Sequence, residues 1–205
     1  MISAKEALRA LREGNQRFVA DQRRDYGDTT ARRRALVAQQ EPFAIILGCS
    51  DARVPAEIVF DQGLGDLFVI RVAGNIVAPS QIGSVEFAAD AFGTRLVVVL
   101  GHTNCGAIAA TLTQLKRPWR EQSRNLTSIV DRIRPAVEDL LEGQVPESEL
   151  TQRATRANIR MSADHLRHGS EVLENLIRRD GLLVVGAEYS VASGVVEFFD
   201  GLPPD

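Results

Sequence analysis

The sequence predicts an α/β fold in which helices flank a central, mostly parallel β-sheet. Short, continuously apolar segments rich in β-branched residues occur at residues 43–47, 67–70 and 96–100, a pattern typical of strands buried on both faces. Helical patterns separate these segments, and strands that alternate with helices form parallel sheets through right-handed crossovers. The length of 205 residues fits a single domain. Its expected parts are an N-terminal helical arm (1–41), an α/β core (42–122) and a C-terminal part with helices and edge strands (123–205).

Two helices are expected before the first strand. Ser3 and Glu6 have the spacing of a capping box, which predicts a helix over about residues 3–20. The polar stretch 21–30 is typical of a loop. A second short helix that includes residues 35–37 is expected between this loop and the first strand.

Within the α/β core, two segments between the strands are expected to be helical. The first covers residues 55–60 and has a proline at its start, where the missing N–H costs nothing. The second covers residues 80–92, with Ser80 as its N-cap.

The C-terminal part begins with a stretch rich in charged residues, 123–179, for which two or three surface helices are expected. Its helical spacing is interrupted at Pro135, Gly143 and Pro146. Two further strands, at 182–185 and 195–199, are expected on either side of a turn rich in small residues.

Composition excludes several classes of function. Lys and Arg number 24 against 27 Asp and Glu, giving a net charge of −3, so the chain lacks the basic field that binds a phosphate backbone and no nucleic-acid partner is expected. The apolar stretches are far shorter than the roughly 20 residues of a membrane span. Residues 1–6 lead into a helix instead of a secretory signal, so a cytoplasmic location is expected. Two cysteines are too few for a disulfide framework.

Two of the predicted strands end in reactive residues. The first runs into Gly-Cys-Ser-Asp-Ala-Arg at 48–53, and the third into Gly-His-Thr-Asn-Cys-Gly at 101–106. In an open parallel sheet, sites form at the carboxyl ends of the strands. Cys49, His102 and Cys105 are therefore expected to meet at one edge of the sheet.

Two thiolates and an imidazole suit zinc, and a set of two cysteines and one histidine is a known catalytic zinc site with an open fourth position. Asp51 would either fill that position, closing the site, or hold a water there. Arg53, two residues further on, would keep Asp51 ionised and fix its orientation. The alternative is that both cysteines are buried hydrophobic residues, the commoner fate of a free cysteine. Their paired occurrence at two strand ends favours the metal site.

Three motifs resemble the β-class carbonic anhydrases. They are Cys-Ser-Asp-Ala-Arg at 49–53, Arg-Val-Ala-Gly-Asn at 71–75 and Gly-His-Thr-Asn-Cys-Gly at 101–106. They occur in the family's order and at its spacing, and the resemblance extends over nearly the whole chain.

The resemblance implies a zinc-dependent lyase that hydrates carbon dioxide reversibly to bicarbonate and a proton, formed by one catalytic domain of residues 1–205. Zn²⁺ would be held by Cys49, His102 and Cys105. An Asp51–Arg53 pair would act beside the metal, with Asp51 as a fourth ligand in a closed state.

The resemblance also implies a homodimer or homotetramer, with N-terminal helices that embrace the neighbouring subunit. Gln40 matches a glutamine that reaches the substrate across the dimer interface. Phe68 and Phe87 match positions that line the narrow carbon dioxide pocket.

Two alternatives remain open at the level of sequence. The same fold and metal would serve a hydrolase of carbonyl sulfide or carbon disulfide, if access to the pocket decides the substrate. A non-enzymatic zinc-stabilised binding or redox-sensing protein would have a closed coordination shell and no need for the pair of Asp51 and Arg53.

Overall fold

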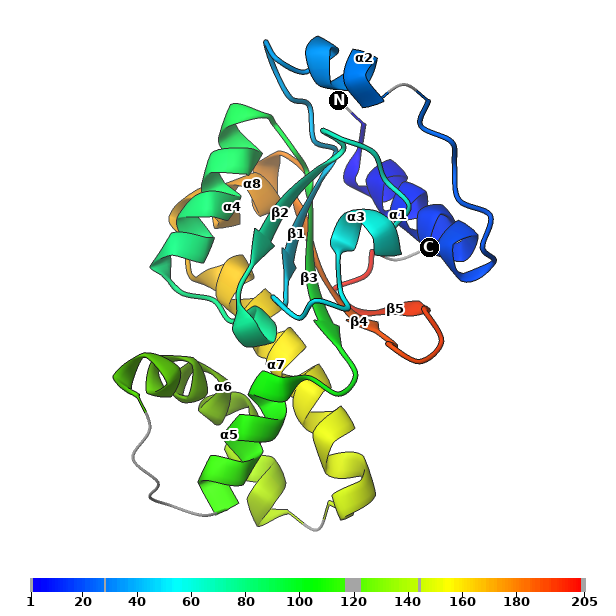
Figure 1. Cartoon of the computed structure of the whole chain (residues 1–205). Helices are drawn as coiled ribbons and strands as arrows, with labels where there is room; N and C mark the ends of the chain where they lie inside the picture. Colours follow the sequence, from blue (N-terminus) through cyan, green and yellow to red (C-terminus); the bar gives the residue numbers. More distant parts are fainter. Residues whose placement is uncertain (1, 28, 117–122, 144, 204–205) are drawn as a thin grey trace.

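The computed structural model describes residues 2–27, 29–116, 123–143 and 145–203 and shows a five-stranded sheet between helices (Figure 1). The order of the strands is β2-β1-β3-β4-β5. Four strands are parallel, namely β1 (Ala44–Gly48), β2 (Leu67–Arg71), β3 (Leu96–His102) and β4 (Leu183–Tyr189). The last strand, β5 (Val196–Asp200), is antiparallel to β4. The predicted α/β class with a mostly parallel sheet is confirmed.

One face of the sheet is covered by α1 (Ala4–Val19) and the short α3 (Ala56–Val59). Ser3 and Glu6 form the predicted capping box at the start of α1. The apolar side of α1 packs against the even-numbered side chains of β1 and β3, which point to this face because side chains alternate along a strand. Within one chain, α1 is therefore part of its own core.

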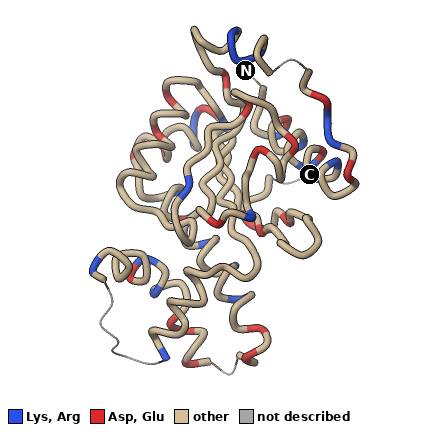
Figure 2. The backbone as a smooth tube through the Cα atoms, in the orientation of Figure 1, with Lys and Arg blue, Asp and Glu red and all other residues tan. Residues whose placement is uncertain are grey.

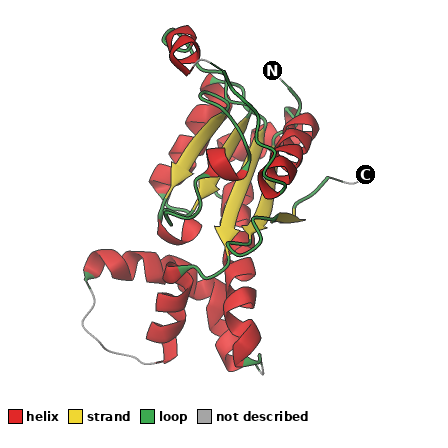
Figure 3. Ribbon diagram, turned by 45° about the vertical axis from the view of Figure 1, so that its right-hand side comes forward, coloured by secondary structure: helices red, strands yellow, loops and turns green. Residues whose placement is uncertain are grey.

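The opposite face is covered by α4 (Pro79–Ala91), α7 (Glu147–His168) and α8 (Glu171–Arg179), which pack against the odd-numbered side chains of β1 and β3. Figure 3 shows the sheet between these two layers of helices. Burial on both faces explains the continuous apolar runs of β1 and β3, whose residues are all buried. The expectation that residues 67–70 form a buried strand is wrong, because β2 is an edge strand and these residues are only half-buried.

A helical region lies beyond the carboxyl ends of the parallel strands, at the bottom of Figures 1 and 3. It consists of α5 (Gly106–Lys116), α6 (Arg124–Glu142) and the first half of α7, which contact one another. A 3₁₀ turn, η1 (Ala73–Asn75), follows β2 and also contacts this region. Helices thus cover the carboxyl ends of the strands, where the sequence predicts a site.

The second helix lies earlier than the sequence predicted. The polar stretch 21–30 was expected to be a loop, but α2 occupies Thr29–Ala35 and ends before Leu36. No residue of α2 is buried, so it has no apolar periodicity by which a sequence pattern could reveal it. The side chain of Arg32 anchors it, since Nε donates to the carbonyl of Leu64 and Nη2 to Asp66.

The predicted N-cap of α4 is wrong by two residues. The helix has Ala78 at its N-cap and Pro79 at its first position. Proline presets the helical φ and has no N–H to leave unpaired, so it can begin the helix without a capping side chain. Ser80 lies inside the first turn, and its hydroxyl donates to Gln81 Oε1.

Pro135 does not interrupt a helix, although its sequence position suggested a break. It lies inside α6 between the buried residues Val130, Ile133 and Val137. An interior proline costs about 3 kcal/mol, and the burial of this apolar stripe offsets that cost. The expected breaks at Gly143 and Pro146 are confirmed, because these residues form the C-cap of α6 and the N-cap of α7.

Two further expectations for the C-terminal part are corrected. The helix α7 is not a surface helix, because eight of its residues are buried. The strand β4 is not an edge strand, because it pairs with β3 on one side and with β5 on the other. The expected boundary at residue 122 lies outside the described residues.

Acidic and basic residues are interspersed along the fold, as the blue and red segments of Figure 2 show. None of the helices in the described part of the chain has the length and apolarity that a membrane span requires.

Candidate metal centre

The predicted convergence of three ligand-type side chains is present in the structure. Cys49 directly follows β1, and His102 is the last residue of the neighbouring β3. Cys105 directly precedes α5, after a turn in which Asn104 has a left-handed φ of 58°. The exposed fractions of the three side chains are 5%, 0% and 1%.

The donor atoms of these three residues face one another. The two Sγ atoms are 4.0 Å apart, and each donor atom lies within 4.8 Å of the others. His102 Nδ1 lies 2.9 Å from the carbonyl oxygen of Thr103. Because a carbonyl only accepts hydrogen bonds, Nδ1 carries the proton and Nε2 has the free lone pair.

This donor set fits zinc. His102 Nε2 is buried and has no hydrogen-bond partner among the described residues, which is costly unless a cation or water occupies the space before it. Two sulfurs that each lie about 2.3 Å from a zinc ion are at most about 4.6 Å apart, and the observed 4.0 Å satisfies this limit. Two soft sulfurs and an imidazole nitrogen also match the ligand preference of zinc.

The two cysteines have opposite pKa shifts. A hydrogen bond between the sulfurs lowers the pKa of Cys49 well below its usual value, and His102 and the N–H of Gly74 lower it further. The thiolate of Cys49 in turn raises the pKa of Cys105, as does burial. The lowered pKa of Cys49 favours its thiolate form, which is the form that binds a cation.

Asp51 and Arg53 form the predicted pair beside the three ligands. Oδ1 of Asp51 accepts hydrogen bonds from Nε of Arg53 at 2.9 Å and from its backbone N–H at 3.0 Å. Oδ2 accepts one bond from Nη2 at 2.8 Å. The hydrogen bonds from Arg53 hold the pKa of Asp51 far below its usual value.

Among the described residues, the hydrogen bonds to the Asp51 carboxylate leave one acceptor site free, on Oδ2. Each carboxylate oxygen has two lone pairs, and Arg53 occupies both of those on Oδ1 but only one on Oδ2. Oδ2 lies 3.9 Å from His102 Nε2. The free lone pair is thus close to the ligand atoms and available to a small molecule bound among them.

Arg71, the last residue of β2, is a site residue for which the sequence predicted no role. Its Nε donates to the carbonyl of Cys49 at 3.2 Å, and its Nη2 donates to the carbonyl of Asp51 at 2.8 Å. Arg71 therefore holds the loop that carries both residues. Its only signal in the sequence is an arginine at the end of an apolar run.

Gly74 is a second missed residue. Its N–H donates to Cys49 Sγ at 3.4 Å, and its φ of 71° lies in the left-handed region that favours glycine. A Cβ atom there would lie 2.9 Å from Ile133 Cδ1 and 3.0 Å from Ala107 Cβ. Both conformation and space therefore require glycine.

The three residues expected to contact the substrate gather around Phe92 instead of around the ligands. The ring of Phe92 lies 6.0 Å from Phe68 and 5.4 Å from Phe87, measured between centroids. Gln40 and Phe92 together line two surface cavities of about 580 and 700 Å³. Phe87 is 56% exposed, which is unusual for a large aromatic side chain.

Within one chain, this aromatic group is remote from the ligands. Phe68 pairs with Ile45 near the start of β1, whereas Cys49 follows the end of that strand. Four residues of strand separate the two levels by about 13 Å. The structure does not bring Gln40, Phe68 or Phe87 together with the metal ligands of the same chain.

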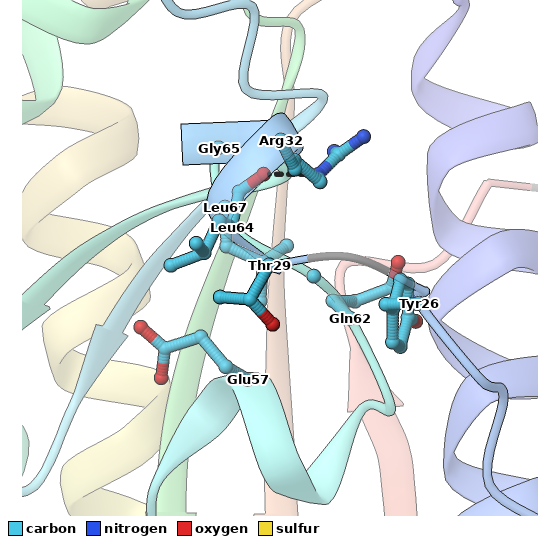
Figure 4. Close-up of a pocket in the computed structure, with 9 residues that line it drawn as sticks. Tyr26, Thr29, Arg32, Glu57, Gln62, Leu64, Gly65 and Leu67 are labelled. Carbon is cyan, nitrogen blue, oxygen red and sulfur yellow. Dashed lines mark hydrogen bonds between the residues drawn. The ribbon is translucent and has the colours of Figure 1, made fainter. Parts of the chain in front are cut away.

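A further cavity, of 310 Å³, lies near the start of β2 (Figure 4). Arg32 and Leu64 contribute to its wall, and the dashed line in the figure is the hydrogen bond from Arg32 to the Leu64 carbonyl. Because β2 begins at Leu67, this cavity lies at the amino ends of the parallel strands, whereas the ligands lie at their carboxyl ends. It is not part of the candidate metal centre.

Comparisons with known proteins agree with this arrangement. The family model described as carbonic anhydrase matches residues 44–196. A carbonic anhydrase of Mycolicibacterium smegmatis is 36% identical, over 93% of this chain and 91% of its own length. Carbonic anhydrase 2 of Mycobacterium tuberculosis H37Rv is 37% identical, over 92% of this chain and 89% of its own.

Solved structures give the same result. The β-carbonic anhydrase CafA of Aspergillus fumigatus superposes with a TM-score of 0.75 at 27% identity, over 85% of this chain and 83% of its own. The β-carbonic anhydrase CcaA has a TM-score of 0.70 at 25% identity, over 97% and 93% of the two chains. The chain therefore belongs to the β class of the carbonic anhydrase family and is an enzyme of that class.

Proposed function

We propose that this enzyme hydrates carbon dioxide reversibly to bicarbonate and a proton, with one zinc ion held by Cys49 Sγ, His102 Nε2 and Cys105 Sγ. The observation that carries the proposal is the buried, unpartnered His102 Nε2, which faces two sulfurs within 4.8 Å. When bound, zinc supplies Lewis acidity that makes a hydroxide nucleophile available near neutral pH.

Asp51 is proposed to orient the nucleophile. Because its pKa is held far below its usual value, the carboxylate is ionised near neutral pH, so it accepts hydrogen bonds and does not donate them. Its one free acceptor site, on Oδ2, would take the hydrogen of the nucleophile and direct the oxygen lone pair toward carbon dioxide. Orientation of this kind removes part of the entropic barrier.

Arg53 is proposed to control whether the site is open. In the structure, its fork of hydrogen bonds holds Asp51. If Arg53 released the carboxylate, Asp51 could become a fourth ligand and close the site. Zinc-bound structures determined at acidic and alkaline pH test this switch, and an identical Asp51 position in both would contradict it.

A second copy of the chain is proposed to complete the substrate pocket. Gln40, Phe68 and Phe87 lie at the opposite end of β1 from the ligands, so they can reach a metal centre only in a neighbouring molecule. A two-fold symmetric homodimer places the same surface of each copy against the other and satisfies this requirement twice. A homotetramer would pair two such dimers.

The proposed surroundings of the enzyme follow from its thiols. Cys49 and Cys105 are free, and metal binding requires that they stay reduced. A cytoplasmic location provides this condition. The proposed partners are carbon dioxide, bicarbonate and further copies of the chain, without nucleic acid or membrane.

Metal analysis combined with stopped-flow hydration of carbon dioxide at pH 7 and pH 8.5 tests the proposal. We expect equimolar zinc, turnover by the wild type, and a loss of about 100-fold or more in Asp51→Ala with zinc retained. Asp131→Ala is the matched control, because Asp131 also accepts a hydrogen bond from a nearby arginine, Arg134, but lies exposed on α6. It is expected to behave like the wild type.

Two results would contradict the proposal. One is a purified chain that neither contains nor binds zinc. The other is a zinc-bound chain that turns over carbonyl sulfide or carbon disulfide but not carbon dioxide. Removal of zinc by a chelator should abolish hydration, and added zinc should restore it.

A further inference from the structure

We propose that Asn158, on α7, is a positioning residue for the metal centre. It acts through Gly74, which aims one N–H hydrogen bond at the sulfur of Cys49. The inference rests on the proposed zinc site. The three proposed ligands lie outside α7, and the inference gives this helix a role in positioning one of them, Cys49.

Two hydrogen bonds in series connect Asn158 to the ligand. Asn158 is 2% exposed, and its Nδ2 donates to the carbonyl oxygen of Gly74 at 2.8 Å. Because a carbonyl only accepts, the amide nitrogen must be the atom that faces it. The N–H of Gly74 then donates to Cys49 Sγ at 3.4 Å. Asn158 and Gly74 are 84 residues apart in the sequence.

The turn between these bonds is formed by two residue types that tolerate a left-handed backbone. Gly74 and Asn75 have φ angles of 71° and 43°. Glycine adopts many other conformations as readily, so contacts with neighbouring elements must select this one. The side chains of Ala107 and Ile133 leave no room at the Cα of Gly74, and Asn158 fixes its carbonyl. Three helices, α5, α6 and α7, therefore determine where the Gly74 N–H points.

This N–H matters because it acts on a metal ligand. A hydrogen bond to a thiolate withdraws charge from the sulfur and fixes the direction of its lone pairs. Groups that orient the ligands of a metal typically change metal affinity by about 10–100-fold when they are removed. Without Asn158, the Gly74 carbonyl would be buried without a partner, and the turn would lose the contact that sets its ψ angle.

The test measures metal binding directly, on the full chain. Zinc affinity is determined by competition with a chromophoric chelator, and the thiolate-to-cobalt absorption is recorded after substitution with Co²⁺. Asn158→Leu keeps the branched shape of the side chain but removes the donor. Asn158→Ala removes the donor and leaves a smaller side chain. We expect both variants to bind zinc about 10–100-fold more weakly and to shift the cobalt absorption.

Thr155→Val is the matched control. Thr155 lies one turn earlier on α7 and is also 2% exposed, but its hydroxyl bonds to Thr151 within the helix. A merely structural role of α7 predicts that this variant and the Asn158 variants change equally. The inference predicts wild-type zinc affinity and cobalt absorption for Thr155→Val.

The possible failures are distinguishable. If the wild type binds no zinc, the proposed function is wrong. If the wild type binds zinc and the Asn158 variants match it in affinity and cobalt absorption, only the role of Asn158 is wrong. If Asn158→Leu does not fold, Asn158→Ala decides between these outcomes by the same two measurements.

Discussion

Arg53 donates two side-chain hydrogen bonds to Asp51, from Nε to Oδ1 at 2.9 Å and from Nη2 to Oδ2 at 2.8 Å. This bidentate contact fixes the plane of the carboxylate. It leaves the free lone pair of Oδ2 on the side of His102, whose Nε2 is 3.9 Å away. Arg53 thereby sets the direction of the Asp51 carboxylate beside the metal centre, although it has no hydrogen bond to a ligand side chain among the described residues.

Arg53→Lys tests this relationship. A lysine keeps the charge but is a point donor that cannot reproduce the planar fork. We expect kcat/KM for carbon dioxide hydration to fall about 100-fold with the zinc content unchanged, because misplacement of a positioning group by about 1 Å has this effect. The control is Arg134→Lys, since Arg134 pairs with Asp131 on the exposed side of α6. Equal kcat/KM in Arg53→Lys and the wild type would contradict the orienting role of the fork.

Phe87→Asp tests the proposed role of a second copy. Phe87 is 56% exposed and lies in contact with Phe92, and exposed aromatic residues are frequent anchors of interfaces. We expect sedimentation to show an oligomer for the wild type and a 22.4 kDa monomer with little hydration activity for the variant. Val172→Asp is the control, as Val172 is 47% exposed on α8. A wild type that sediments as an active monomer would exclude the shared pocket.

Gly14→Ala tests how α1 docks on the core. Gly14 lies against the backbone of Phe60, and a Cβ atom would overlap the Phe60 carbonyl oxygen. We expect a loss of about 3 kcal/mol in the free energy of unfolding, the upper end of the usual cost of overpacking. Gly83→Ala is the matched control in α4, where a Cβ would meet open space, and it should stabilise the protein by about 0.5–1 kcal/mol. Chemical denaturation measures both, and equal effects would contradict the close approach.

The capping box gives α1 a pH dependence. The hydrogen bonds from Ser3 hold the pKa of Glu6 below its usual value. A lowered carboxyl pKa contributes stability above the usual value and loses it as the pH falls through the lowered one. The wild type should therefore be more resistant to urea than Glu6→Gln at pH 7, and the difference should become smaller at pH 3. Glu13→Gln, an exposed substitution on the same helix, is the control for the loss of a negative charge from α1. The prediction would be contradicted if the difference in urea resistance between the wild type and Glu6→Gln were the same at both pH values.

Much of the fold could be predicted because its signals are local. Continuous apolar runs marked β1, β2 and β3. For β1 and β3 the reason is burial along the whole strand, which leaves no polar side. The elements that were misplaced lack such a signal or depend on their surroundings. The solvated α2 buries no residue, and the tolerance of α6 for Pro135 depends on the apolar contacts of its neighbours.

By itself, the sequence determined the fold class, the family, and the residues that meet as candidate metal ligands. Cys49 directly follows β1 and His102 ends the adjacent parallel strand β3, so their convergence follows from the direction of the strands and needs no knowledge of side-chain packing. Only the tertiary structure decided which groups hold those ligands in place. Asn158 reaches Gly74 across 84 residues, and Phe68 turned out to lie at the opposite end of the sheet from the ligands of its own chain. Contacts of this kind depend on how helices pack, and no pattern within a few residues of sequence encodes that packing.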